Sequence, residues 1–133
     1  MSRKSEGLLA SLLDERWSAT HAPVPNSANA NVSIAAPQSA NSRHNLETVS
    51  YSFKNLTGAN ATVVTSVRDS TITGTVRASW EDIVAAGVTG GKVLDNLGIQ
   101  GLKGDSLWIT QDTKQASVTG IVNASGWTDT TNA

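Results

Sequence analysis

The chain has 133 residues, enough for one domain with a hydrophobic core but not comfortably for two. The formal net charge of −1 gives no basic surface for nucleic acid or an anionic membrane, and the lack of cysteine excludes disulfide bonds, thiolate metal ligands and cysteine nucleophiles. Charged residues make up 16% of the chain, against roughly 25% in ordinary soluble domains, and serine, threonine, asparagine, alanine and glycine take their place, as in a β protein with hydroxyl- and amide-rich faces.

The first predicted element is a helix over about residues 5–17. Large apolar side chains recur here at helical spacing, and polar residues lie off their stripe. The members of the stripe are Leu8, Leu9, Leu12, Leu13 and Trp17. A helix of about 13 residues is marginal alone in water. We therefore expect the stripe to pack either on its own domain or, as an arm, on another subunit or a different protein.

Residues 1–30 as a whole are predicted to form an N-terminal arm, in which the helix is followed by an extended linker. Pro23 and Pro25 stiffen the linker, and the residues around them offer little to bury. The leucine-rich run resembles a signal peptide weakly, but charged residues at 14–16 interrupt it, so we expect the segment to be retained. No apolar run approaches the roughly 18 residues that span a bilayer.

Residues 31–127 are predicted to form a β-sandwich, because apolar side chains recur there with a period of two. In the strongest strand, Val49, Tyr51 and Phe53 share one face. Leu46 has the other parity, which indicates a bulge near residues 47–48 or burial on both faces. About eight strands at roughly 8–12-residue spacing predict an antiparallel, jelly-roll-like sandwich of two sheets. Residues 128–133 are predicted to be a polar tail.

Three of the four tryptophans lie in or next to predicted strands. Trp80 is in phase with the core-facing residues of its strand and is predicted to be buried. Trp108 is out of phase with Leu107 and Ile109, so it faces away from the main core. It could be an intersubunit contact, a satellite core under a loop, or a platform for a carbohydrate. The same three interpretations apply to Trp127.

The sequence contains no pattern that indicates catalysis or metal binding. His21 and His44 have no ligand partners at metal-site spacing, and no serine lies in a nucleophile elbow. A glycosidase needs two carboxylates facing one cleft, and no pair stands out. The candidates are Glu47, Asp69, Glu81, Asp82, Asp95, Asp105 and Asp112. We therefore expect a protein that is not an enzyme and holds no metal or cofactor. Residues 103–105 (Lys-Gly-Asp) are read as an ordinary turn rather than an adhesion motif.

The segment 43–127 resembles the small β-sandwich structural proteins of tailed-phage virions, of the capsid decoration, cement or head-fibre type. The features that carry the resemblance are Arg43-His44-x-Leu46, Val67-Arg68-Asp69-Ser70, Gly74-Thr75, Leu97-Gly98-Ile99-x-Gly101, Gly104-Asp105-x-Leu107-x-Ile109, and a final Val-rich strand that ends in Gly126. The resemblance implies a β-sandwich that decorates or cements a capsid or forms a head fibre or collar, and it implies no catalytic residue.

We therefore expect a non-enzymatic capsid decoration or cement protein. It would bind the major capsid protein or other virion proteins, act as a homo-oligomer (a trimer is favoured), and occupy the capsid surface after assembly in the host cytoplasm. The leucines at positions 8, 9, 12 and 13 and Trp17 would dock the arm, and Trp108 and Trp127 would be intersubunit contacts. The alternative is a carbohydrate- or receptor-binding module of a phage tail, fibre or spike, and a small hydrolase is a third, weaker interpretation.

Overall fold

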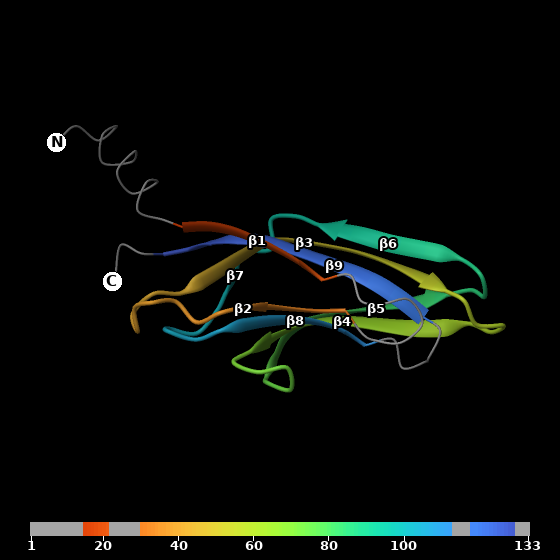
Figure 1. Ribbon diagram of the computed structural model, residues 1–133, viewed down its shortest axis with the longest axis horizontal. Coiled ribbons are helices and arrows are strands. Elements are labelled where there is room, and N and C mark those ends of the chain that lie inside the picture. Colours follow the sequence, from red (N-terminus) through yellow and green to blue (C-terminus); the bar gives the residue numbers. More distant parts are fainter. Residues whose placement is uncertain (1–14, 22–29, 113–117, 130–133) are drawn as a thin grey trace.

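The computed structural model describes residues 15–21, 30–112 and 118–129. Within these residues the chain forms nine strands in two antiparallel sheets, which lie face to face as a sandwich (Figure 1). Sheet A, the upper layer in Figure 1, contains β1 (Glu15–His21), β3 (His44–Asn55), β6 (Thr89–Leu94), β7 (Ile99–Gln100) and β9 (Val118–Thr128). Sheet B contains β2 (Asn31–Ile34), β4 (Ala61–Asp69), β5 (Val76–Val84) and β8 (Leu107–Asp112).

The order of the strands is that of a jelly roll. Sheet A runs β1-β9-β3-β6, with the short β7 also paired to β3, and sheet B runs β2-β8-β4-β5. Consecutive strands alternate between the sheets, except that β4 and β5 form a hairpin in sheet B and β6 and β7 both belong to sheet A. The predicted antiparallel two-sheet sandwich is confirmed.

The strand β1 corrects the prediction of a helix that reaches Trp17 and is followed by a linker. Residues 15–21 instead pair with β9 along their whole length. Trp17 and Ala19 face inward and pack against the core, so a period of two governs these residues rather than a helical period. Residues 5–14, which hold the leucines, and residues 22–29 of the predicted linker lie outside the described part of the chain.

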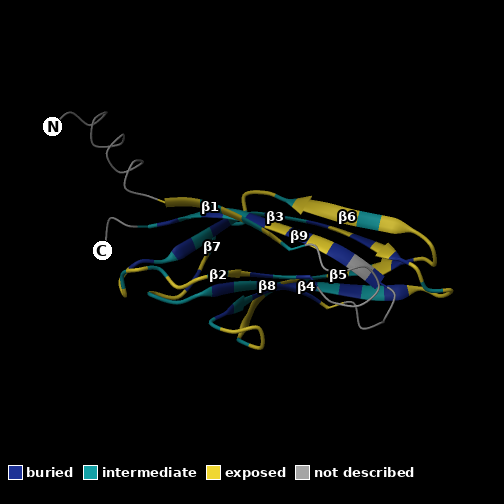
Figure 2. Cartoon of the chain, in the orientation of Figure 1, coloured by how far each residue is buried: buried dark blue, intermediate teal, exposed yellow. Residues whose placement is uncertain are grey.

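The core lies between the two sheets, where their facing surfaces are buried (Figure 2). In sheet A it is built from alternate residues of β3 and β9, and in sheet B from alternate residues of β4 and β8. The largest completely buried side chains are those of Leu46, Leu107 and Ile109. Burial of one such side chain contributes about 1.5–3 kcal/mol, so this layer is the main source of stability. Trp80, which was predicted to be buried, is half-buried and packs against this layer.

A β-bulge at Glu47 explains the change of parity in β3. The register between β3 and β9 shifts between Leu46 and Thr48, and Leu46 and Val49 are consequently both buried although their parity differs. Of the two alternatives that the sequence left open, the bulge is confirmed. The extra residue, Glu47, keeps a half-exposed side chain.

A polar cluster joins the two sheets at the edge formed by β5 and β6. Lys92 of β6 and Asp82 of β5 form an ion pair with an N–O distance of 2.8 Å. The Tyr51 hydroxyl donates a hydrogen bond of 2.7 Å to the same carboxylate. Burial, together with the hydrogen bond to Asp82 and its negative charge, raises the pKa of the Tyr51 phenol. Because β5 and β6 are the outermost strands on this side, the cluster closes the sandwich where the apolar core ends.

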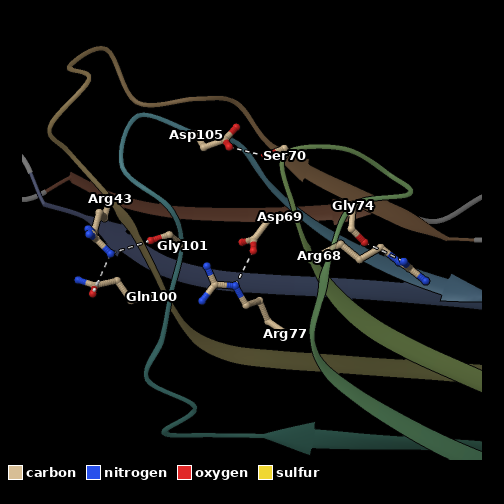
Figure 3. Close-up of polar contacts among 9 residues, drawn as sticks. All are labelled: Arg43, Arg68, Asp69, Ser70, Gly74, Arg77, Gln100, Gly101 and Asp105. Carbon is tan, nitrogen blue, oxygen red and sulfur yellow. Dashed lines mark hydrogen bonds and ion pairs between the residues drawn. The ribbon is translucent and has the colours of Figure 1, made fainter.

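Hydrogen bonds tie together the turns at one end of the sandwich (Figure 3). The Ser70 backbone N–H donates to the carbonyl of Ser106 over 3.1 Å. The Asp105 carboxylate accepts hydrogen bonds from the Ser70 hydroxyl and from the backbone N–H of Ser106. The buried Asp69 is paired with Arg77. Residues 103–105 thus belong to a structural turn, as predicted.

Candidate functional site

The described elements form two layers only (Figure 1), and none of these elements covers the outer face of either sheet. On sheet A, Trp127 of β9 lies in register between Arg16 of β1 and Asn45 of β3. Its sequence neighbours Gly126 and Thr128 are buried, whereas Trp127 is only half-buried. Since side chains alternate between the faces of a strand, Trp127 lies on the outer face.

Beside Trp127 the surface of sheet A is hollowed into a groove of about 620 Å³. The groove is lined by Asn45, Leu46, Glu47, Thr48, Asp95, Asn96, Gly98 and Trp127. The connection from β6 to β7 turns tightly here, because Asn96 and Gly98 have φ angles of 54° and 59°, in the left-handed region that asparagine and glycine adopt most readily. The backbone N–H of Leu97 donates to the carbonyl of Glu47 over 2.9 Å, which holds this connection against the bulge of β3.

The polar groups of the groove make hydrogen bonds and an ion pair near its surface. The Thr48 hydroxyl donates to the Asp95 carboxylate over 3.3 Å, and the Glu47 carboxylate is paired with Arg16 at 2.8 Å. An ion pair as exposed as this one contributes at most about 1 kcal/mol to stability. The groove therefore presents amide, hydroxyl and carboxylate groups next to an indole ring. Such a set can hydrogen-bond a polar ligand while the ring contacts its apolar face.

A second, shallower hollow of about 350 Å³ lies farther along β3 on the same sheet. It is lined by Ser50, Tyr51, Ser52, Gly91, Lys92, Val93 and Asn123. The outward-facing residues here are small and polar, apart from Val93, whose side chain is 67% exposed. From Asn45 in the first hollow to Ser52 in the second, β3 extends about 20 Å.

The outer face of sheet B also carries large apolar side chains. Trp108 of β8 is half-buried and lies in register between Ser33 of β2 and Arg68 of β4. On the outermost strand β5, Val76 and Ile83 are exposed, and Ile83 is the more exposed of the two at 72%. An outermost strand offers backbone groups that no neighbouring strand pairs, so exposed apolar side chains along it are typical of a contact with another chain.

The structure separates the residues that the sequence analysis grouped together. Trp17 packs in its own sandwich, with its ring edge-on to His44 at a centroid distance of 5.9 Å. The four leucines proposed to dock the arm lie outside the described residues. Trp108 and Trp127 lie on the outer faces of different sheets, so one flat contact surface cannot include both.

Sequence reasoning missed Glu47, Asp95 and Asn96 as partners in one groove. Glu47 and Asp95 were considered only as separate carboxylates, and the pairing of β3 with β7 and the bulge bring them together with Asn96. Their signal in the sequence was limited to the parity change after Leu46 and the Asp-Asn-x-Gly turn.

Among the described residues there is no group of three or more histidine or acidic side chains that could hold a metal ion. The same residues include no helix long and apolar enough to cross a membrane. That the protein holds no cofactor and is not an enzyme remains a prediction from its sequence.

No protein-family model matches the sequence, and no curated protein is significantly similar to it. Among solved structures, the chain is similar to a CBM4 structure, with 11% identity and a TM-score of 0.41 over 82% of this chain and 70% of that one. It is similar to the Tobacco streak virus coat protein dimer, with 13% identity and a TM-score of 0.39 over 84% of this chain and 85% of that one. It is also similar to the C-terminal family 22 carbohydrate binding module of Clostridium thermocellum Xyn10B, with 10% identity and a TM-score of 0.40 over 91% of this chain and 87% of that one. These similarities are weak, so the function has to be inferred from the residues of this chain.

Proposed function

We propose that the protein is a non-enzymatic structural protein of a tailed-phage virion. More specifically, it is a capsid decoration or cement protein that binds the lattice of the major capsid protein, as a homo-oligomer, and stabilises the shell. The resemblance of residues 43–127 to the small β-sandwich structural proteins of tailed-phage virions supports this role. A jelly roll is compatible with it, since viral capsid domains use this architecture, but a fold alone does not fix a function.

The observation that carries the proposal is the set of large apolar side chains on the outer face of sheet B. Ile83 is the most exposed large apolar side chain among the described residues, and it lies on the outermost strand of this sheet. Val76 and Trp108 share the same face. Large apolar side chains on an uncovered sheet face favour burial against a neighbouring molecule. The low charge of the chain also suits close packing in a lattice.

We further propose that Leu8, Leu9, Leu12 and Leu13 dock on a neighbouring subunit. They precede β1, which is one of the two edge strands of sheet A and, among the described residues, pairs with β9 alone. Trp17 does not belong to this docking set, because it packs against the core of its own sandwich. Replacement of Trp17 would consequently test stability rather than attachment.

An Ile83→Lys variant tests the proposal. On particles assembled without this chain, wild-type protein should bind and raise the temperature at which the shells break. Ile83→Lys should bind at least tenfold more weakly, because a buried lysine without a partner is costly at an apolar contact. Val93→Lys is the matched control, since Val93 is 67% exposed and lies on the outermost strand of the other sheet.

Equal occupancy of the shells by wild type, Ile83→Lys and Val93→Lys would contradict the role of sheet B. Light scattering on the same three proteins tells two kinds of contact apart. A smaller native mass for Ile83→Lys alone means that the face joins copies of this chain. An unchanged mass with lost shell binding means that the face contacts the capsid protein.

A further inference from the structure

We infer that the outer face of sheet A binds a neutral oligosaccharide, with Trp127 as the stacking platform. This function goes beyond the proposed virion role and uses the opposite sheet, so the two can succeed or fail independently. A virion protein with such a surface would attach the particle to glycans.

The position of Trp127 suits it to stacking. The indole lies on the outer face between Arg16 and Asn45 in the neighbouring strands, and it forms part of the wall of the 620 Å³ groove. Because the ring is half-buried on a central strand of the sheet, little conformational freedom is lost when a ligand packs against it. An aromatic ring next to polar groups favours the C–H face of a sugar ring.

The other groove residues match the hydroxyl groups of a sugar. Asn45 and Asn96 offer amides that both donate and accept, and Thr48 offers a hydroxyl. The Asp95 carboxylate only accepts, and a carboxylate accepts strong hydrogen bonds from hydroxyl groups. These groups come from two separate parts of the chain, and the Leu97–Glu47 backbone hydrogen bond fixes the two parts relative to one another.

The charged groups at the groove favour a neutral ligand. The groove contains two carboxylates, those of Glu47 and Asp95, and the adjacent cation Arg16 is already paired with Glu47. Lys92, at the second hollow, is paired with Asp82. An acidic saccharide would therefore meet the like charges of Glu47 and Asp95, which disfavours its binding.

The length of the surface selects an oligosaccharide rather than a single sugar. The two hollows follow one another along β3 over about 20 Å. The outward side chains at the second hollow include the small and polar Ser50, Ser52 and Asn123, beside the exposed Val93. A linear chain can thus lie along the strand, with one sugar on Trp127 and further sugars over the second hollow.

The test is a glycan array that carries neutral and acidic oligosaccharides, probed with the full-length protein, followed by fluorescence titration with the best neutral ligand. We expect binding to at least one neutral oligosaccharide and quenching of tryptophan fluorescence. Trp127→Ala should weaken binding roughly tenfold or more. Ile72→Ala is the control, because Ile72 is an exposed apolar residue in the turn between β4 and β5 of the opposite sheet and does not line either hollow. It should leave the affinity unchanged.

Asn96→Gly provides a second variant that keeps the turn, since glycine readily adopts the positive φ of this position. It removes one amide from the groove and should weaken binding severalfold without changing the melting temperature. The proposal is overturned if no neutral glycan on the array binds, if acidic glycans bind more tightly than neutral ones, or if a folded Trp127→Ala variant binds like the wild type.

Discussion

Replacement of Gly126 by alanine should lower the free energy of unfolding by about 3 kcal/mol. Gly126 lies in β9 between Trp17 of β1 and Leu46 of β3. A Cβ atom at this position would lie 2.7 Å from Cζ2 of Trp17 and would overlap the backbone carbonyl of Asn45. The indole packs against the core and the carbonyl is part of β3, so relief of the overlap has to disturb the pairing of β1, β9 and β3.

Urea unfolding monitored by circular dichroism measures this effect. Gly58→Ala is the matched control, because nothing lies within 4 Å of a Cβ added there. It should change the free energy of unfolding by less than about 0.5 kcal/mol. If Gly126→Ala were as stable as Gly58→Ala, residues 15–21 could not be packed against β9 in the way described.

The phenol of Tyr51 should not ionise near pH 10 while the protein is folded. The pKa of an unperturbed tyrosine is about 10, and burial, the hydrogen bond to Asp82 and the charge of Asp82 all raise the pKa of Tyr51. A folded-state pKa above the unfolded value means that the unfolded chain loses this proton first. The contribution of the protonated Tyr51 to the free energy of unfolding is complete below about pH 10 and is lost progressively as the pH rises above that value.

Tyrosinate absorbance reports on this residue alone, because Tyr51 is the only tyrosine in the chain. In an alkaline titration the absorbance should rise only together with loss of the folded circular dichroism signal, whereas the urea-unfolded chain should titrate near pH 10. Tyr51→Phe should make stability less dependent on pH in this range. An absorbance midpoint near pH 10 in protein that is still folded would show that the phenol is not held by Asp82.

The β domain was largely predictable because its strands have strong two-residue periodicity. Val49, Tyr51 and Phe53 alternate with polar residues, and burial of one face enforces that register. The bulge near Glu47 was predicted as one of two alternatives, because the apolar residues of this strand change parity after Leu46. The edge strand β1 was not foreseen. Trp17 follows the leucines before it at helical spacing, so the local pattern favoured a helix. The strand forms because these residues pair with β9, which is distant in the sequence and leaves no signal in the local pattern.

The groove could not be predicted for a similar reason. Glu47 and Asp95 are far apart in the sequence, and they meet because β3 pairs with both β6 and β7. The outward direction of Trp108 and Trp127 was predictable from parity. That they lie on different sheets depends on the jelly-roll strand order, which a single sequence pattern does not encode.

The proposed virion role is tested most directly by quantitative mass spectrometry of purified virions, with the copy number of this chain measured against that of the major capsid protein. We expect the chain to be present in a fixed ratio to the capsid protein. We also expect particles stripped of the chain to break at a lower temperature and to regain their stability when the protein is added back. Absence of the chain from purified virions would contradict the proposed virion role.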